Sequence, residues 1–446
     1  MILHNKATRL SLREFSSTQM RAFHMTWMSF FLCFFGWFGL APLMPVVRDE
    51  LHLTKEQVGN SAIAAVAITI VARLLIGWLC DRIGPRKTYT ALLLVGSFPV
   101  MFAGLAHDYT TFLMVRLAIG AIGASFVITQ YHTSVMFAPN VVGTANATAA
   151  GWGNLGGGIT QMVMPLLFTA FVSMGAGAAW GWRMAMFVPG VALFIAGIAY
   201  FFLTKDTADG NFDELRAKGQ LGTKANSTAG FWEACRDSRV WALAMLYGCC
   251  FGIELTIDNY AALYFTDYFK ASLTTAGLLA GTFGMMNLFA RALGGIISDR
   301  FGLRWGLRGR TMLLGATIFC EGLGLILFSR MTILPAAVAA MMLAGLFVKM
   351  SNGATYSLVP FVNKKAIGAV AGIVGAGGNL GAVLAGFLFK SSSITWPQAI
   401  LILGSVVAVS SVLAFLVRFS EADETVAQRE LHARLGGSMI PASAGD

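Results

Sequence analysis

The sequence predicts an all-α membrane protein, with twelve transmembrane helices arranged as two pseudo-symmetric bundles of six. Composition is the first observation behind this prediction. Of the 446 residues, 56% are hydrophobic and only 12% are charged, and the mean hydropathy of +0.68 is too high for a soluble domain of this length. The apolar residues also form runs long enough to cross a bilayer, and motifs of the first half return in the second half.

Twelve apolar runs of about 19 to 30 residues have the length that a spanning helix needs. Six are expected to form an N-terminal bundle over 24–204, at 24–47, 57–80, 88–107, 110–137, 143–172 and 182–204. Six are expected to form a C-terminal bundle over 239–418, at 239–268, 273–298, 311–329, 333–360, 367–390 and 397–418. The remaining segments are predicted to be cytoplasmic: an N-terminal segment at 1–23, a linker at 205–238, and a polar, disordered tail at 419–446.

The distribution of Lys and Arg predicts the orientation. If both termini are cytoplasmic, most of these residues fall in inner loops, and the outer loops hold only Arg48, Lys55, Arg183, Lys270, Arg330 and Lys390. This positive-inside bias favours cytoplasmic termini for a multi-pass protein of the plasma membrane. The net charge of +10 then reflects loops beside anionic lipid, and no nucleic-acid partner is expected.

Two arginines, Arg73 and Arg291, lie inside apolar runs at corresponding places in the two halves. Each precedes by eight residues the aspartate of an Asp-Arg pair, Asp81 or Asp299. Eight helical residues span roughly 12 Å, which places both arginines near the middle of a hydrocarbon layer roughly 30 Å thick. A charge at that depth is costly unless it faces a cavity or a partner, so a functional site is the default interpretation. Two such cations predict an anionic ligand.

A second repeated segment places an asparagine at the same depth in each half. Asn154 lies in the glycine-rich run 151–156 and Asn379 in the similar run 376–381. If the two helices begin near residues 143 and 368, each asparagine is roughly 16 Å deep. Glycines let membrane helices approach closely, and packing explains most of them. The two amides are expected to take part in binding the substrate.

The repeated segments resemble motifs of a known family. Residues 77–87 look like the loop motif between the second and third helices of the major facilitator superfamily. Residues 149–158 and 375–381 resemble the paired signatures of its nitrate/nitrite porter family. Further segments are similar to the high-affinity nitrate transporters of plants, algae and cyanobacteria, namely Ala41-Pro42-Leu43-Met44-Pro45, Thr129-Gln130-Tyr131, Gly252-Ile253-Glu254-Leu255, Asp258-Asn259 and Gly353-Ala354-Thr355. The likeness covers about residues 25–418.

The resemblance implies that nitrate, with nitrite as an alternative, is held between Arg73 and Arg291. A guanidinium is planar, permanently charged and offers forked donors that match a flat oxyanion. The superfamily fold would set Asn379 beside Arg73 and Asn154 beside Arg291. The chain lacks the long central loop of fungal members and the long tail of plant members, so the need for a plant-type accessory membrane subunit stays open.

Two aromatic residues and two glycines complete the predicted substrate site. Tyr247 and Phe34 fall at a depth similar to that of the arginines and would wall in the anion and exclude water. Helix packing or lipid contact is the alternative for each ring, and cavity lining is favoured for Tyr247 because its hydroxyl needs a partner. Gly151 and Gly378, in the paired signatures, are assigned to the same site.

Four other charged residues lie within predicted spans. Arg116 is in a segment that looks like the superfamily's fourth-helix motif, which is linked with proton coupling, and a structural role is the alternative. Glu254 is the leading candidate for a titrating group, against a structural ion pair. Glu321 and Lys349 fall near mid-depth on neighbouring helices, where either alone would be costly. A structural pair between them is expected, although Lys349 is also a candidate for proton coupling.

The two Asp-Arg pairs, Asp81-Arg82 and Asp299-Arg300, are interpreted as gating latches. Each aspartate would accept from a helix N-terminus or a nearby arginine in the outward-open state. The contact would then be released as the cytoplasmic side opens.

Energetics constrain the mode of transport. Moving one anion into an inside-negative cell costs about 2.3 kcal/mol per 100 mV, so uptake must be driven. Symport with two or more protons makes the cycle net positive, so that the potential helps, whereas nitrate/nitrite exchange is electroneutral. The resemblance to the assimilatory transporters favours proton symport, and exchange is the main alternative. A transport-inactive nitrate receptor is a further alternative. No enzyme is expected, because the sequence offers no nucleophile-base pair, metal cluster or phosphate-binding loop, and no cofactor is implied.

Overall fold

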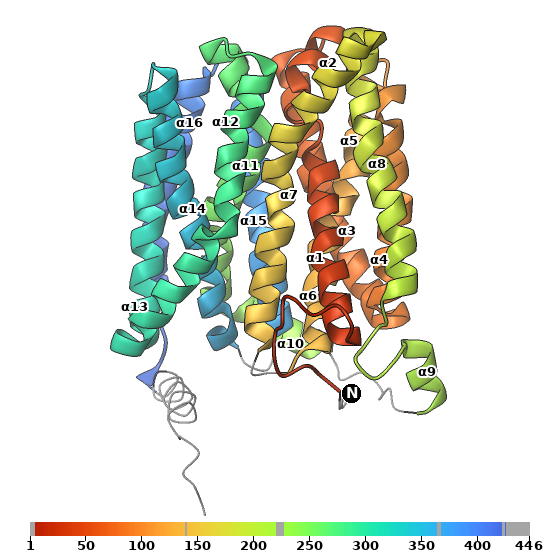
Figure 1. The fold of residues 1–446 in the computed structure, drawn as a ribbon. Coiled ribbons are helices and arrows are strands. Elements are labelled where there is room, and N and C mark those ends of the chain that lie inside the picture. Colours follow the sequence, from red (N-terminus) through yellow and green to blue (C-terminus); the bar gives the residue numbers. More distant parts are fainter. Residues whose placement is uncertain (1–4, 139–140, 220–226, 364–366, 422–423, 425–446) are drawn as a thin grey trace, which may run out of the picture.

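The computed structural model describes residues 5–138, 141–219, 227–363, 367–421 and 424, and these form a bundle of long helices (Figure 1). Nine helical stretches in these ranges are long and apolar enough to cross a membrane. Two of them, Thr144–Leu203 with 60 residues and Leu273–Ser329 with 57 residues, would measure roughly 90 Å if straight. Each therefore crosses a bilayer of roughly 30 Å twice. With α1 (Thr18–Phe38), the chain makes the twelve predicted crossings.

The first half of the chain supplies six crossings. They are α1, α3 (Lys55–Ile83), α4 (Pro85–Met101) with η1 (Phe102–Leu105), α5 (Tyr109–Gly120) with η2 (Ala121–Ala124) and α6 (Ser125–Met136), α7 (Val142–Phe171), and α8 (Gly177–Leu203). The short α2 (Met44–Glu50) and η3 (Val172–Ala176) lie in the connections. The first predicted span, 24–47, is thus divided, because the chain turns between Phe38 and Met44.

The second half supplies the other six crossings. They are α11 (Ser238–Phe269), α12 (Leu273–Met285) with η4 (Met286–Leu288) and the start of α13 (Ala290–Ser329), the rest of α13, α14 (Leu334–Val362), α15 (Ile367–Lys390), and α16 (Trp396–Ser410) with η5 (Ser411–Leu416). The predicted loop at 299–310 is helical except at Gly306, whose backbone angles of φ 66° and ψ −156° reverse the chain. Only glycine adopts such angles readily. Gly175 (φ 96°) and Gly177 (φ 67°) make the corresponding turn between α7 and α8.

The segment between the halves is fastened to the first half at the lower end of Figure 1, where the N-terminus also lies. It contains α9 (Phe212–Ala217) and α10 (Ser227–Arg236). The Asp206 carboxylate accepts hydrogen bonds from the backbone N–H groups of Arg86 (2.9 Å) and Phe212 (3.0 Å), and Lys87 pairs with Asp213 (2.5 Å). Burial raises the pKa of Asp206, whereas Lys87 lowers the pKa of Asp213.

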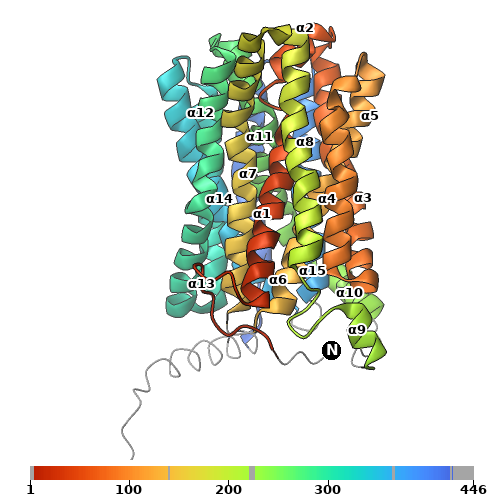
Figure 2. The ribbon, with the colours of Figure 1, turned by 45° about the vertical axis from the view of Figure 1, so that its right-hand side comes forward.

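The two halves meet along α3 against α15 and α7 against α12, with α1 and α11 between them (Figures 1 and 2). Glycines set the closest approach. A Cβ atom on Gly158 of α7 would lie 2.6 Å from Gly284 Cα of α12. Such packing of small residues is how membrane helices gain van der Waals contact. The predicted arginines therefore lie on helices at or beside this interface.

Candidate functional site

Arg73 lies in the middle of α3 and points across the interface to α15. Its Nη1 donates to the Gly375 carbonyl at 3.4 Å, and its guanidinium lies 5.5 Å from the centre of the Phe126 ring. Its Nε is buried without a hydrogen-bond partner. Among the described residues no carboxylate pairs with Arg73, so it brings an uncompensated positive charge to the interface.

Arg291 lies at the start of α13, directly after a break in the helix. Phe289, with φ −132° and ψ −36°, is not helical and separates α13 from η4. The Nη2 of Arg291 donates to Glu254 Oε2 at 3.1 Å, and the guanidinium lies 5.8 Å from the centre of the Phe251 ring. Its Nε, like that of Arg73, is buried without a partner. Arg291 therefore keeps donors free although it is paired with a carboxylate.

Tyr356 of α14 lies between the surroundings of the two arginines, with Arg73 on one side and the ring stack that Arg291 borders on the other. It interacts electrostatically with both Arg73 and Arg291. A Cβ atom built on Gly375 would lie 3.4 Å from the Tyr356 hydroxyl and 3.8 Å from Arg73 Nη1. Arg73 and the Tyr356 hydroxyl therefore lie together beside Gly375, and Tyr356 acts electrostatically on an arginine of each half. A shared ligand for the two arginines stays a prediction.

Aromatic rings form one wall of this site. The Tyr247 ring stacks on Phe251 with the ring centres 5.1 Å apart, and it meets Tyr356 edge-on at 5.1 Å. Gly378 of α15 makes room for the stack, because a Cβ atom there would lie 2.7 Å from both Tyr247 and Phe251. Gly151 has no such role, since its nearest neighbour would be 3.5 Å away. Phe34 is buried and packs edge-on against Phe30 and Trp37 of its own helix.

The two asparagines are buried with unused hydrogen-bonding atoms. Asn379 donates to the Gly375 carbonyl at 3.3 Å, the same oxygen that Arg73 approaches, and its Oδ1 has no partner. Asn154 is 2% exposed, and neither of its side-chain polar atoms has a partner among the residues that the structure describes. Asn379 thus lies beside Arg73 as expected. No hydrogen bond joins Asn154 to Arg291 among the described residues. Buried amides without partners are rare and indicate a place for a polar ligand or water.

Glu254 of α11 is the centre of a polar cluster next to Arg291. Besides Arg291, it accepts from Asn287 (3.0 Å) and Asn352 (2.6 Å), and its Oε1 lies 2.6 Å from Lys349 Nζ. Glu254 is 1% exposed and Lys349 is fully buried. Two cations and two amides therefore hold this carboxylate, which is the arrangement that a buried charge requires.

The predicted pairing of Lys349 with Glu321 is wrong, because Lys349 pairs with Glu254. Glu321 is buried, and neither of its carboxyl oxygens has a hydrogen-bond partner. The two residues do interact electrostatically. The direction of the Lys349 side chain decides its partner, however, and this side chain points to α11 rather than to Glu321 on α13.

Arg116 links the two halves above the arginine site. It is 1% exposed, its Nη2 donates to Asn259 Oδ1 of α11 at 3.2 Å, and its Nη1 approaches the Trp37 carbonyl at 3.5 Å. No carboxylate pairs with it in the described part of the chain. Its partners are those of a residue that holds α5, α1 and α11 together.

The predicted latches lie at the lower end of the bundle. The side chain of Asp81 falls outside the described part of the structure. The Arg82 guanidinium lies 4.9 Å from the centre of the Trp78 ring. The backbone carbonyl of Arg82 accepts a hydrogen bond from Arg216 of α9. Asp299 pairs with Arg310 at 2.8 Å within α13, and Arg300 is exposed.

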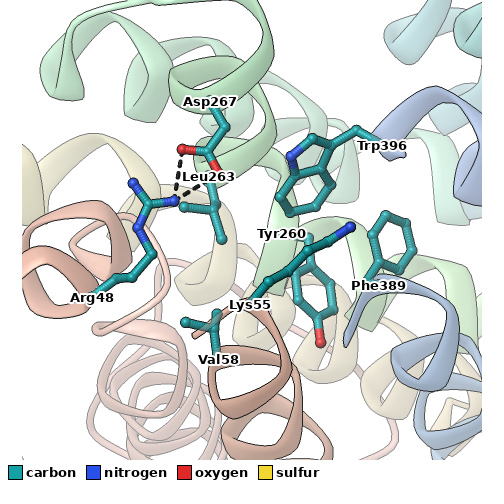
Figure 3. Close-up of a pocket in the computed structure, with 8 residues that line it drawn as sticks. All are labelled: Arg48, Lys55, Val58, Tyr260, Leu263, Asp267, Phe389 and Trp396. Atoms are coloured by element: carbon teal, nitrogen blue, oxygen red, sulfur yellow. Dashed lines mark hydrogen bonds and ion pairs between the residues drawn. The ribbon is translucent and has the colours of Figure 1, made fainter. Parts of the chain in front are cut away.

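At the upper end, polar contacts join the two halves across a pocket of about 90 Å³ (Figure 3). Arg48 of α2 donates twice to the Asp267 carboxylate of α11, at 2.8 and 2.7 Å. Lys55 donates to the Ile394 carbonyl at 2.5 Å and lies 5.5 Å from the centre of the Trp396 ring. Below them, the Tyr260 hydroxyl approaches the Gly59 carbonyl at 3.5 Å. The upper end is therefore closed by direct bonds between the halves.

Several residues of the site were not predicted individually: Phe251, Asp258, Asn287, Asn352 and Tyr356. Tyr356 directly follows the segment Gly353-Ala354-Thr355, so its place beside a family motif was a usable signal. Asn287 and Asn352 are amides inside apolar runs, which is the same signal that identified Asn154 and Asn379. No pattern in the sequence distinguished Phe251 from the many phenylalanines that only pack.

Comparisons with known proteins show the family of this chain. The family model of the major facilitator superfamily matches residues 26–360 and 255–442. High affinity nitrate transporter 2.5 of Arabidopsis thaliana is 38% identical over 94% of this chain and 83% of its own length. High-affinity nitrate transporter 2.3 of Oryza sativa subsp. japonica is 40% identical over 86% of this chain and 74% of its own length. The nitrate/nitrite transporter NrtP of Nostoc punctiforme is 31% identical, with 82% and 86% covered.

Solved structures with a similar course of the chain are also transporters. A bacterial homologue of the human lysosomal transporter Spinster, in an inward-facing and occupied conformation, superimposes with a TM-score of 0.69 at 15% identity and covers 91% of this chain and 99% of that one. The nucleoside transporter NupG gives a TM-score of 0.63 at 16% identity, with 90% and 100% covered. At these identities the likeness concerns the fold alone.

Proposed function

The chain belongs to the major facilitator superfamily and, within it, to the nitrate/nitrite porter family, and on this premise we propose that it takes up nitrate through the plasma membrane by proton-coupled symport. The relatives that cover most of the chain carry the name of nitrate transporters, which supports nitrate as the cargo. Twelve crossings in two related halves are the architecture in which such carriers alternate access to a central site.

The observation that carries the proposal is that one group of rings is bordered by an arginine from each half. Arg73 lies with the Tyr356 hydroxyl beside Gly375, and Arg291 lies over Phe251, whose partner in the stack, Tyr247, meets Tyr356. One cation comes from each half, both retain free donors, and the rings of Tyr247 and Phe251 exclude water from one side. A flat oxyanion between two guanidinium forks would satisfy these donors. The unpartnered amides of Asn154 and Asn379 are the remaining polar groups proposed to serve the same ligand.

The charge of the site explains how binding drives the cycle in this proposal. At a separation of about 8 Å and an effective dielectric constant of about 20, two guanidinium groups repel each other by roughly 2 kcal/mol. An anion between them relieves that repulsion. Without an anion, this repulsion opposes the approach of the two halves. With an anion bound, the two halves can rock together. Glu254 holds Arg291 and Lys349 in place and remains a candidate, with Arg116 and Lys349, for coupling to protons.

The orientation follows from the positive-inside bias. With both termini in the cytoplasm, the upper end that Arg48 and Asp267 close faces the outside. The structure then represents a stage of the cycle that is closed to the outer solution. Release of these bonds would open the route by which nitrate enters.

The test is nitrate-evoked current at several external pH values in a heterologous cell with the intact protein in its plasma membrane. Symport with two or more protons gives an inward positive current that grows as the external pH falls. An electroneutral flux that needs internal nitrite supports the second candidate, a nitrate/nitrite exchanger, which the name of the NrtP relative favours. Binding of nitrate without any flux would indicate a receptor. Full activity of the chain alone would show that no accessory subunit is needed.

A further inference from the structure

Asp258 is a second buried carboxyl group on the helix that carries Glu254. The two residues are four positions apart on α11, so they lie on one face and one turn from each other. Asp258 is 4% exposed. Its carboxylate makes no hydrogen bond or ion pair with any described residue, whereas Glu254 accepts from two amides and two cations. Two carboxyl groups of the same helix face therefore have opposite environments.

Asp258 lies at the seam between the halves. A Cβ atom built on Gly157 of α7 would lie 3.4 Å from its Oδ2, and its backbone carbonyl accepts from Gln161 of α7 at 2.6 Å. The same stretch of α7 carries Asn154, three residues before Gly157. The carboxyl group is thus next to the proposed anion site and faces the half of the molecule to which it does not belong.

The charged groups around Asp258 come from three other helices as well as its own. Glu254 on α11, Lys349 on α14 and Arg291 on α13 act on it electrostatically. Arg116 of α5 bonds to the adjacent Asn259. Where α7 and α1 pack closest to it, around Gly157, the described neighbours are uncharged: Gln161, Phe34 and Phe38. No cation lies within ion-pair distance of the Asp258 carboxylate in the described ranges.

A buried carboxylate without donors is unstable in its charged form, and it loses that penalty by taking up a proton. We propose that Asp258 is the group that binds and releases a co-transported proton, while Glu254 stays ionised and positions Arg291. This inference rests on the proposed function, symport of a proton with nitrate. The proton comes from the outer solution, binds to the carboxylate to form the neutral acid, and leaves to the cytoplasm when the site opens there.

Charge couples this proton to the anion. With Asp258 ionised, the cations Arg73, Arg291 and Lys349 face two carboxylates, and the cluster carries one net positive charge. Protonation of Asp258 raises that to two, which favours binding of an anion. Because linkage is reciprocal, nitrate also favours protonation. The sign is therefore fixed: nitrate affinity falls as the pH rises through the range in which Asp258 loses its proton.

The test compares Asp258→Asn with the unmodified protein in reconstituted vesicles and in cells. The amide resembles the neutral acid and cannot release a proton. We expect nitrate binding of the variant to be independent of pH at about the affinity that the unmodified protein has at low pH. Proton-driven net uptake should fall by about tenfold or more, while exchange of nitrate for nitrate across the vesicle membrane, which needs no proton release, stays within about twofold.

Glu321→Gln is the matched control, because it makes the same change at a buried carboxyl group that acts electrostatically on Glu254 and Lys349 but forms no described hydrogen bond to the cluster. It should keep the pH dependence of uptake and of binding. If Asp258→Asn does not reach the membrane, Asp258→Glu replaces it. That variant should keep coupling but move the pH midpoint of uptake, and an unmoved midpoint counts against the proposal.

The possible failures can be told apart. If the unmodified protein shows no pH-dependent, proton-driven uptake, the proposed symport fails and the inference fails with it. If the unmodified protein is proton-driven and Asp258→Asn keeps the full pH dependence, Asp258 is not the proton carrier and symport stands. Loss of exchange together with uptake in a folded Asp258→Asn variant would also overturn the proposal, because it would show a defect in the movement itself.

Discussion

Arg73 and Arg291 occupy matching places in the two halves, yet their surroundings differ. Arg73 lies within the continuous helix α3 and has no carboxylate partner among the described residues. Arg291 follows a break at Phe289 and is bonded to Glu254 at 3.1 Å. The two halves therefore place an arginine at matching positions, but the charges around the two arginines differ. An anion would meet one uncompensated guanidinium and one that is already held by a carboxylate.

The largest effect is expected when Arg291 loses its carboxylate partner. Glu254→Gln removes the only described carboxylate partner of Arg291 and Lys349 and leaves both charges buried. Removal of one partner from a buried ion pair costs about 3 to 5 kcal/mol, so the melting temperature of the purified protein should fall clearly. Glu321→Gln serves as the control, because that carboxyl group has no described partner to lose. Equal stability of the two variants would contradict the clamping role of Glu254.

The next prediction compares the arginines directly. Arg73→Lys keeps the charge and loses the fork, and loss of a charged hydrogen bond of about 1.5 to 3 kcal/mol predicts nitrate affinity weakened by about 10 to 100 times. Arg291→Lys should weaken affinity less, because a lysine can still pair with Glu254. Concentration dependence of nitrate uptake measures both. Equal losses would mean that the two sides contribute symmetrically, and uptake by Arg73→Lys like that of the unmodified protein would exclude forked recognition.

A third comparison uses two glycines of the paired signatures, Gly151 and Gly378, which are not equivalent positions: Gly378 corresponds to Gly153, and Gly151 corresponds to Ala376. A methyl group on Gly378 would lie 2.7 Å from Tyr247 and Phe251, whereas one on Gly151 would meet its nearest neighbour at 3.5 Å. Gly378→Ala should therefore cost about 1 to 3 kcal/mol through overpacking and slow transport. Gly151→Ala should be tolerated within about 0.5 kcal/mol. Thermal melting and uptake rates of the pair test this, and a more harmful change at Gly151 would show that the ring stack does not depend on Gly378.

The smallest effects are expected from the ion pairs at the upper and lower ends of the bundle. Asp267→Asn removes the partly exposed pair with Arg48 that joins the halves, and a loss of at most about 1 kcal/mol would shift the population of outward-open protein by up to about fivefold. Asp299→Asn removes a pair that lies within α13, and it should change that population less. Labelling of a cysteine introduced in the outer pocket reports the shift. A larger shift in Asp299→Asn than in Asp267→Asn would mean that the lower latch governs the population of outward-open protein.

The sequence predicts the position of a residue along its helix better than the direction in which its side chain points. Helical rise gives depth, and it predicts one level for Arg73, Arg291 and Asn379. In the structure, Arg73 and Asn379 approach the same Gly375 carbonyl. It does not give the direction in which a side chain leaves its helix, because that depends on how each helix is rotated against its neighbours. For this reason Lys349 was paired with Glu321 instead of Glu254, and the difference between Glu254 and Asp258 was not visible.

Helix boundaries failed where a single residue decides the path of the chain. Gly306 alone turns α13, so residues expected to form a loop at 299–310 continue as helix on both sides of it. The apolar run at 24–47 contains a turn after Phe38 that hydropathy does not reveal. Composition reports whether a segment prefers lipid, whereas one backbone angle fixes where it bends.

The upper part of α11, which belongs to the second half, is bonded to four elements of the first half. Through Asp258, Asn259, Tyr260 and Asp267 it is joined to α7, α5, α3 and α2. In the proposed cycle, this whole set of bonds has to open before the outer mouth reopens. We therefore expect the return of the unloaded carrier to be a slow step, which external nitrate above saturation does not hasten. Loosening any one of these bonds should quicken the recovery of vacant carriers.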